Sequence, residues 1–204
     1  MKIEEELWRR GFEYIAGVDE VGRGAIAGPV LAAAVILPKN FSPSWIKEIK
    51  DSKLIKESKR EYLSYCIKKN AVSFAIGIVD PRYIDEFGIV DATRRAMLTA
   101  IKNLSRRPDF VLIDFMILPG LDIPSRSIVK GERESITIAS ASIIAKTERD
   151  RILREMEDVY PGYNFARNKG YGTREHMDAI KKLGPCEIHR RSFRPVKHYA
   201  GEEG

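Results

Sequence analysis

Residues 14–37 read YIAGVDEVGRGAIAGPVLAAAVIL, and the apolar run that opens this segment ends in two adjacent acids, Asp19 and Glu20. The apolar residues before Asp19 have the composition of a short buried strand, and residues 28–37 have that of a second strand after a Gly-containing turn. A carboxylate at the buried end of a strand is costly to desolvate unless a positive partner compensates. The segment therefore predicts two strands, with the acids either in a solvated turn or beside a bound cation.

The rest of the chain alternates strand-like and helix-like patterns. Further strands are expected within residues 71–80, 106–114 and 125–131, and helices over 81–104, 134–159 and 174–183. Residues 42–70 predict a turn and an amphipathic helix whose apolar positions include Leu54, Tyr62, Leu63 and Ile67. This order predicts an α/β fold with a mixed central sheet flanked by helices. We expect a catalytic core over residues 1–160 and a small, basic helical lobe over 161–204.

Bulk composition is that of a folded protein of the cytoplasm. Hydrophobic residues make up 44% of the 204 positions and charged residues 31%, which argues against disorder. Two cysteines form neither a disulfide framework nor a zinc set. The charged N-terminus lacks the apolar core of a signal peptide, and no apolar stretch is long enough to span a membrane.

Positive charge is concentrated near the C-terminus. Residues 163–197 hold nine Lys or Arg and three acids, whereas the remaining charges balance at 26 of each sign, so this segment accounts for the net charge of +6. A basic surface of this kind suits a polyanion. A solvated charged face without a ligand explains the charge equally well.

Four acids follow strand ends or precede a helix. Asp19 and Glu20 close the first strand, Asp114 closes the fourth, and Glu132 precedes the long helix. If the first and fourth strands are neighbours, their carboxylates meet at one edge of the sheet, where they repel unless cations bridge them. Oxygen-only ligation suits Mg²⁺ or Mn²⁺, and two such ions can promote phosphodiester hydrolysis. Taken singly, each acid could instead be a turn, cap or helix-dipole residue.

Two glycine-flanked side chains stand near these acids or in the basic segment. Gly22 and Gly24 let the backbone approach a ligand, and Arg23 offers a forked donor for phosphate. Tyr171 lies between two glycines and could stack on a sugar or base, or simply pack. The histidines show no metal-binding spacing, so His176 and His189 are expected to be structural.

Six motifs in chain order resemble the ribonuclease HII family, the prokaryotic type 2 ribonucleases H. They span about residues 14–196 and read AGVDEVGRGAIAGPV, DSKLIKESKREYL, LID, VKGERESITIASASIIAKTERD, NKGYGTREH and GPCEIHRRSF. The resemblance implies a ribonuclease H-like fold with a C-terminal helical extension. It also implies a metal-dependent endonuclease that cuts RNA in RNA–DNA hybrids and cuts 5′ of ribonucleotides embedded in duplex DNA, leaving a 3′-hydroxyl and a 5′-phosphate. Such an enzyme would serve ribonucleotide removal from DNA and RNA primer removal.

The resemblance assigns roles to individual positions. Asp19 and Glu20 match the family's paired metal-binding acids, and Asp114 matches the acid that ends its fourth strand. The loop Gly22–Arg23–Gly24 matches the element that recognises the ribonucleotide 2′-hydroxyl, and Tyr171 matches a tyrosine that stacks on the following deoxyribose.

The sequence departs from the family pattern at three places. Glu132 stands where the family most often has aspartate, which makes it the weakest member of a catalytic and metal-binding set with Asp19, Glu20 and Asp114. Phe115 stands where glycine is common and could reshape the rim of the metal site. The C-terminal residues show no aromatic sliding-clamp motif, so we expect a monomer that does not dock on a clamp.

Two other functions fit the same fold. One is a nuclease that cuts DNA or DNA junctions, although such an enzyme has no use for a loop that recognises a 2′-hydroxyl. The other is a non-catalytic nucleic-acid-binding protein, although clustered carboxylates without metal would repel DNA. Cleavage of plain DNA would favour the first alternative, and binding unaffected by EDTA, with no products in Mg²⁺ or Mn²⁺, would favour the second.

Overall fold

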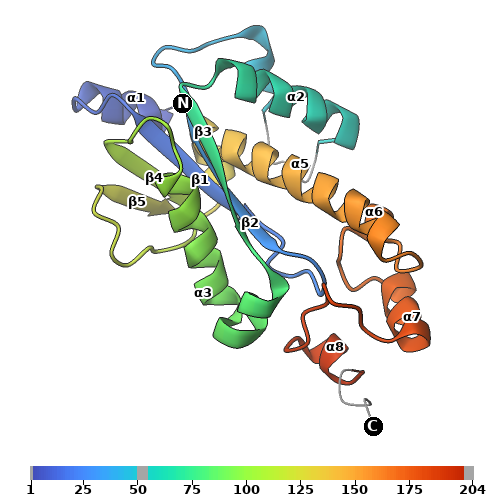
Figure 1. Ribbon diagram of the computed structural model, residues 1–204. Helices are drawn as coiled ribbons and strands as arrows, with labels where there is room; N and C mark the ends of the chain where they lie inside the picture. The colour runs from blue at the N-terminus through green and yellow to red at the C-terminus, as the bar shows by residue number, and fades with distance from the viewer. Residues whose placement is uncertain (1, 50–54, 200–204) are drawn as a thin grey trace.

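The computed structural model describes residues 2–49 and 55–199. Helices and strands alternate along most of this length, as Figure 1 shows. In chain order they are α1 (Lys2–Arg9), β1 (Ile15–Val21), β2 (Val30–Ile36), the 3-10 helix η1 (Ser44–Glu48), α2 (Glu57–Asn70), β3 (Ser73–Val79), α3 (Pro81–Lys102), β4 (Phe110–Asp114), β5 (Ser125–Ile128), α4 (Gly131–Glu134), α5 (Ile136–Val159), α6 (Phe165–Asn168), α7 (Arg174–Leu183) and α8 (Arg194–Lys197).

The five strands form one mixed sheet in the order β3-β2-β1-β4-β5, which confirms the predicted fold class. β1 pairs antiparallel with β2, and β2 pairs antiparallel with β3. β1 pairs parallel with β4, with Val18 opposite Ile113, and β4 pairs parallel with β5. The carboxyl ends of β1, β4 and β5 therefore meet at the same edge of the sheet.

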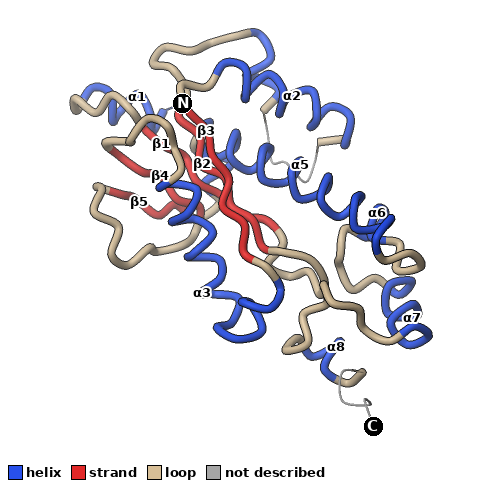
Figure 2. Tube along the Cα trace, in the orientation of Figure 1, coloured by secondary structure: helices blue, strands red, loops and turns tan. Residues whose placement is uncertain are grey.

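Helices cover both faces of this sheet, α3 on one and α5 with α2 on the other (Figure 2). Two strand glycines allow the closest approach. A Cβ at Gly17 would lie 2.1 Å from the backbone carbon of Thr137 in α5, and one at Gly77 would lie 2.0 Å from the carbonyl oxygen of Ala96 in α3. The small residues of α5 also permit a close approach to the sheet, because Ala139, Ala141 and Ala145 are buried in one apolar cluster with residues of β2.

The last three helices gather at the C-terminal end of α5 (Figure 1). Phe165, Ile180 and Val196 are fully buried in one apolar cluster with Leu153 of α5 and Ala27 of the β1–β2 connection. This cluster places residues after 160 directly against the Gly-Arg-Gly loop region. The division of the chain into a core over 1–160 and a lobe over 161–204 stays a prediction.

The N-terminal helix α1 was not expected from the sequence. Leu7 and Trp8 bury its apolar side in a cluster with Ile15, Leu112 and Ile138. Its Glu4 carboxylate accepts hydrogen bonds from the Ser135 hydroxyl (2.6 Å) and from Thr137 at the start of α5. A charged segment with only two large buried apolar residues gives too short a periodic signal for prediction.

The remaining sequence predictions for elements hold with small shifts of their ends. In α2, Leu63 and Ile67 are buried as expected, Tyr62 is half exposed, and Leu54 lies outside the described residues. The long helix begins at Ile136 after the N-cap Ser135, and a separate short helix, α4, precedes it. Among the residues that the structure describes, no helix is both long and apolar enough to cross a membrane.

Candidate active site

Two parallel strands bring the first pair of acids together. Because Val18 of β1 pairs with Ile113 of β4, the next residues, Asp19 and Asp114, lie side by side at the carboxyl edge of the sheet. Glu132 of α4 reaches the same place, and one carboxylate oxygen from each of the three acids lies within 4.8 Å of the other two. The convergence expected from the strand ends is present, and it includes Glu132.

Asp19 occupies the most buried position of the three. Asp19 is only 4% exposed, and its Oδ1 accepts a hydrogen bond from the Glu20 amide at 2.8 Å. Burial raises the pKa of Asp19 well above its ordinary value, and the neighbouring charges of Glu20 and Asp114 raise it further, against a hydrogen bond from Ser142 that lowers it. A divalent cation would relieve both the burial and the repulsion.

A tight turn before α4 positions Glu132. Lys130 adopts a left-handed conformation with φ of 57°, and the Gly131 amide then donates a 2.6 Å hydrogen bond to Asp114 Oδ1. A Cβ at Gly131 would lie 2.6 Å from the Ile138 side chain and 3.2 Å from the same Asp114 oxygen. A side chain at this position would have to displace the end of the Ile138 side chain and would crowd the Asp114 carboxylate, so glycine suits the close approach of α4 to β4.

Glu20 lines the same cavity but does not belong to the group of three. Its carboxylate pairs with the Arg23 guanidinium at 3.4 Å. Burial raises the pKa of Glu20, Arg23 opposes that shift, and the Asp114 charge adds to it. Glu20 thus links the acid cluster to the Gly-Arg-Gly loop.

The cavity around the acids also contains residues that sequence reasoning did not single out. Ser142 and Lys146, one helical turn apart on α5, line it together with Glu20, Val21 and Tyr171. Asp150 holds Lys146 through a side-chain hydrogen bond from the ammonium group at 2.5 Å. Ser142, Lys146 and Asp150 are spaced at i, i+4 and i+8, which places them on one face of a helix. The sequence shows this spacing, but only the position of α5 in the fold brings that face to the acid cavity.

The donor set fits a hard divalent cation. All the converging donors are carboxylate oxygens, which suit Mg²⁺ or Mn²⁺ and do not suit zinc. Three clustered acids, one of them with a strongly raised pKa, carry a local negative charge that such an ion would neutralise.

The Gly-Arg-Gly loop lies against the loop that carries Tyr171. The amides of Ile26 and Ala27 both donate to the carbonyl of Gly170, at 2.8 and 3.1 Å. A Cβ at Gly170, whose φ is 77°, would lie 2.4 Å from the Ala27 carbonyl oxygen, so only glycine permits this approach. Tyr171, 37% exposed, is thereby held at the wall of the acid cavity.

Two buried arginines hold these loops, and neither was identified as a site residue from the sequence. Arg149 of α5 donates to the carbonyls of Pro29 (3.0 Å), Lys169 (2.7 Å) and Ala27 (3.0 Å), and its guanidinium lies 5.6 Å from the Tyr171 ring centroid. A Cβ at Gly22, whose φ is 90°, would lie 2.2 Å from the Arg149 Nε. The loop glycine is therefore required by Arg149 as well as by its backbone conformation.

Arg190, one of the nine basic residues counted between positions 163 and 197, does not lie on the surface. Its guanidinium is fully buried and donates to the carbonyls of Arg23 (3.0 Å) and Gly28 (3.0 and 2.9 Å), so it is not part of a basic surface. Burial lowers the pKa of Arg190 to about 9, and the nearby Arg149 charge adds to the shift. Composition cannot distinguish such an arginine from a surface one.

The two histidines near the C-terminus are structural, as expected. His176 and His189 are buried and face each other through their Nε2 atoms at 3.0 Å. His176 Nδ1 lies 2.8 Å from the Tyr171 carbonyl oxygen, so its N–H donates there, and Cys186 donates to His189 Nδ1 through its amide at 2.9 Å. This chain of bonds fixes the backbone of the Tyr171 loop.

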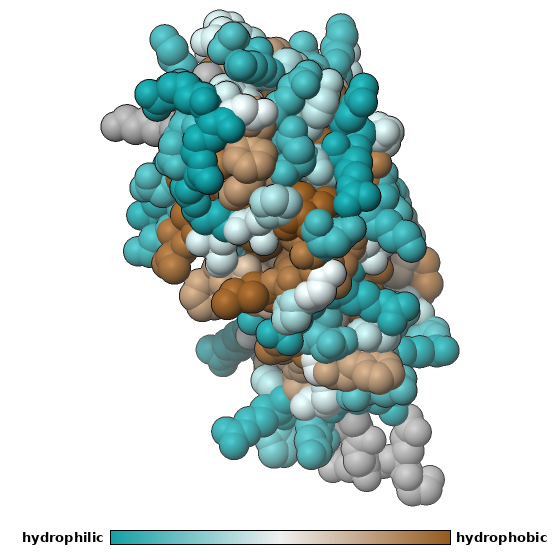
Figure 3. Space-filling model, turned by 90° about the vertical axis from the view of Figure 1, so that its left-hand side faces the viewer, coloured by the Kyte–Doolittle hydropathy of each residue, from teal (hydrophilic) through white to brown (hydrophobic). Residues whose placement is uncertain are grey.

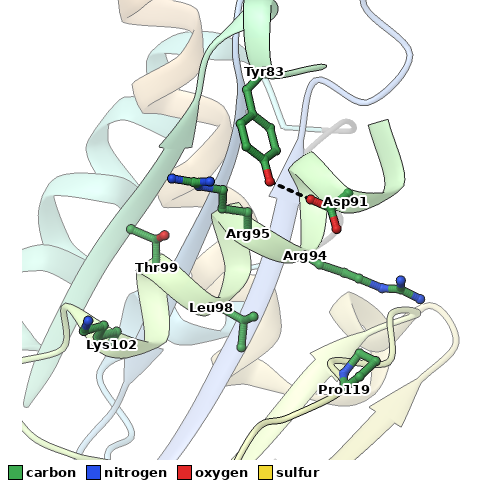
Figure 4. Close-up of a pocket in the computed structure, with 8 residues that line it drawn as sticks. All are labelled: Tyr83, Asp91, Arg94, Arg95, Leu98, Thr99, Lys102 and Pro119. Atoms are coloured by element: carbon green, nitrogen blue, oxygen red, sulfur yellow. Dashed lines mark hydrogen bonds between the residues drawn. The ribbon is translucent and has the colours of Figure 1, made fainter. Parts of the chain in front are cut away.

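The acid cavity is small, and larger hollows lie elsewhere. A groove of about 470 Å³ runs along α3 (Figure 4). In it, the Tyr83 hydroxyl donates a hydrogen bond to the Asp91 carboxylate. The basic side chains of Arg94, Arg95 and Lys102 project from the same helix. The residues that line the groove include none of the acids or loop residues proposed for the site.

Comparison with known sequences extends over nearly the whole chain. The family model described as Ribonuclease HII matches residues 16–196. A ribonuclease HII from Caldanaerobacter subterraneus subsp. tengcongensis is 54% identical over 190 residues, 93% of this chain and 78% of the relative. A ribonuclease HII from Dehalococcoides mccartyi is 49% identical over 194 residues, 95% of this chain and 92% of the relative.

Solved structures share the fold at low sequence identity. The ribonuclease H2 from Pyrococcus horikoshii OT3 superposes with a TM-score of 0.76 at 22% identity, covering 91% of this chain and 96% of that one. Bst-RNase HIII in complex with Mn²⁺ superposes with a TM-score of 0.65 at 17% identity, covering 92% of this chain and 69% of that one. With the family match and the relatives at about half identity, these findings lead to one conclusion: the chain belongs to the ribonuclease HII family and is a ribonuclease H, a metal-dependent nuclease.

Proposed function

We propose that this enzyme hydrolyses the RNA strand of RNA–DNA hybrids and cuts 5′ of ribonucleotides embedded in duplex DNA, leaving a 3′-hydroxyl and a 5′-phosphate. Family membership supports the ribonuclease H activity on RNA paired with DNA. The observation that carries the rest is the meeting of Asp19, Asp114 and Glu132 within 4.8 Å, beside a loop pair built from glycines.

The acids would hold Mg²⁺ or Mn²⁺ in a two-ion site. When bound, such ions activate a water molecule and stabilise the leaving oxygen of a phosphodiester. Asp19, Asp114 and Glu132 supply the first oxygens, and Glu20, at the wall of the same cavity, completes the set. Glu132 would serve in place of the more common aspartate, because its carboxylate oxygen lies within 4.8 Å of those of Asp19 and Asp114.

The two loops would select the cleavage position. Exposed Gly24 leaves the backbone open to a ligand, and nothing in the described residues lies within 4 Å of a Cβ built there. Backbone groups of Gly22, Arg23 and Gly24 at this point can bond to a ribose 2′-hydroxyl, the group that distinguishes RNA from DNA. Tyr171, on the opposing loop, offers a ring to the next sugar.

The cellular setting follows from this chemistry. We propose that the enzyme removes ribonucleotides from DNA and RNA primers in the cytoplasm, as a monomer. The basic residues after 160, other than the buried Arg190, would bind the duplex backbone. The RNase HII of Archaeoglobus fulgidus was solved in a complex with PCNA. This chain has no aromatic clamp motif in its sequence, and we propose that it acts without a clamp.

One cleavage experiment tests the proposal. The protein is incubated with a duplex containing a single ribonucleotide, a continuous RNA–DNA hybrid and plain duplex DNA, each with Mg²⁺, Mn²⁺ or EDTA. We expect cleavage of the first two with either ion, none in EDTA, and a cut 5′ of the single ribonucleotide. Cutting of plain DNA would indicate the DNA nuclease. Metal-independent binding without products would indicate the non-catalytic protein.

Asp19→Asn is the matched active-site variant, with Asp158→Asn as control because Asp158 is exposed on α5 outside the acid cavity. We expect Asp19→Asn to abolish cleavage of both RNA-containing duplexes while duplex binding stays near the wild-type value. Normal turnover by Asp19→Asn would refute the metal-site assignment.

A further inference from the structure

Phe115 follows Asp114 directly and has an unusual backbone conformation. Its φ is 54°, in the left-handed region that glycine tolerates and a bulky aromatic residue rarely adopts. Its side chain is also 60% exposed. Neither feature stabilises the fold, because the conformation is strained and the ring gains little burial.

The local structure explains how this conformation turns the ring outward. The Phe115 amide donates to the Ile128 carbonyl of β5 at 3.0 Å, and the Met116 amide donates back to the Asp114 carbonyl at 2.5 Å. The chain therefore turns sharply within one residue, so that Met116 enters the core and the Phe115 ring remains at the surface. Glycine at this position would make the same turn without strain.

Two other exposed apolar residues lie close to Phe115 along the chain or across the β4–β5 pairing. Val129, directly after the Ile128 that bonds to Phe115, is 68% exposed, and Ile117 is 70% exposed. We refer to Phe115, Ile117 and Val129 as the apolar rim. From the side of the molecule where β5 lies in Figure 1, the space-filling view shows hydrophobic side chains gathered in a band across a mostly hydrophilic face (Figure 3).

The position of the rim indicates what covers it. Phe115 directly follows Asp114 in the chain, and Val129 precedes Glu132 by three residues, so a duplex bound at the acid cavity comes within reach of the rim. Exposed Lys130 and Arg133 flank it with positive charge. Aromatic and apolar side chains interleaved with cations suit nucleic acid, whose sugars and bases contact the former and whose phosphates contact the latter.

We propose that Phe115 is a substrate-binding residue whose ring packs on the sugar or base of a nucleotide next to the scissile phosphate. The inference rests on the hydrolysis of RNA–DNA hybrids and not on the proposed 5′ cut at embedded ribonucleotides. Strain at Phe115 is then the consequence of directing an aromatic ring toward the substrate from the residue after a metal-binding acid.

The test compares Phe115→Gly and Phe115→Leu with Phe74→Ala. Phe74 is a partly exposed phenylalanine near the start of β3, the edge strand of the sheet on the side away from β4 and β5. We expect Phe115→Gly to raise KM for a continuous RNA–DNA hybrid roughly 5- to 50-fold, with kcat within about twofold, because stacking on a base or sugar is lost. Phe115→Leu should lie between wild type and Phe115→Gly, and Phe74→Ala should leave KM unchanged.

Thermal unfolding separates binding from structure. Phe115→Gly relieves the positive φ, so its Tm should equal or exceed that of wild type while its KM rises, a combination that loss of a structural side chain does not produce. Unchanged KM in Phe115→Gly overturns the proposal, as does a KM increase matched by a lower Tm and absent from Phe115→Leu. A change of oligomeric state with unchanged KM would make the rim a protein interface instead. If wild type cleaves the hybrid but makes no cut 5′ of a single ribonucleotide in duplex DNA, only the proposed cleavage at embedded ribonucleotides is refuted.

Discussion

Replacing Arg149 with methionine tests how the loop that follows β1 and the loop that carries Tyr171 are held together. The guanidinium is fully buried and donates to three backbone carbonyls, those of Ala27, Pro29 and Lys169, at 2.7–3.0 Å. Each hydrogen bond from a charged group contributes about 1.5–3 kcal/mol, and the unpaired carbonyls would remain buried. Methionine retains the apolar stem and avoids the desolvation of a charge, which offsets part of the loss. We therefore expect the free energy of unfolding to fall by about 3–5 kcal/mol, the range for breaking a buried charged arrangement.

Urea denaturation measures this loss. With a slope of about 2 kcal/mol per molar urea, the unfolding midpoint of Arg149→Met should fall by roughly 2 M. Arg151→Met is the matched control, since Arg151 lies two residues further along α5, is exposed, and pairs with the surface acids Glu148 and Glu155. A surface pair contributes about 0–1 kcal/mol, so its midpoint should hardly move. Equal midpoints for the two variants would refute the assignment of Arg149 as the connection between the loops.

Three further outcomes follow from the charges at the site and beneath it. In metal-free protein the pKa of Asp19 is raised, so the stability that its protonated carboxyl contributes is complete below about pH 4 and is lost as pH rises through the folded pKa. At pH 8 in EDTA the buried carboxylate destabilises wild type, so Asp19→Asn, which carries no charge, should have the higher Tm. The pKa of His189 is lowered from 6.5 to about 4 and that of His176 is also lowered, mainly by burial. The contribution of this histidine pair to the free energy of unfolding should therefore be constant above about pH 6.5 and should fall between pH 6.5 and 4. Urea titrations in which wild type and His189→Asn show the same pH dependence over that range would contradict the buried neutral pair. Glu132→Gln should weaken Mn²⁺ binding by calorimetry about tenfold or more, whereas Glu132→Asp should keep it, and equal affinity of Glu132→Gln and wild type would show that Glu132 is not a ligand.

Most of the fold could be predicted because its elements carry strong local patterns. The strands from β1 to β4 are dense in apolar residues, and α7 ends at Leu183 before Gly184 as its helix-stop signal indicates. The helix α1 could not be predicted, because its role depends on Glu4 meeting Ser135 and Thr137, more than 130 residues away in the sequence.

The acids of the site could be located from the sequence, but their supports could not. Asp19, Asp114 and Glu132 follow elements whose ends are visible in the pattern, and the strand pairing then brings them together. Arg149 and Arg190 look like any other basic residues in a basic sequence. Nothing local indicates that their guanidinium groups are buried among carbonyls of a loop more than 100 residues earlier.

The sequence by itself determined the strand ends, the carboxylates on them and the glycines that permit close backbone approach, because these depend on residue type and short-range spacing. Only the tertiary structure decided which carboxylates share one cation site and which arginines are structural. Both depend on pairing between distant segments, where the register of β1 against β4 and the burial of α5 against two loops set the distances. Burial then changes the chemistry of the same side chains: it raises the pKa of Asp19, and it makes Arg190, one of the basic residues counted near the C-terminus, a support for the Gly-Arg-Gly loop.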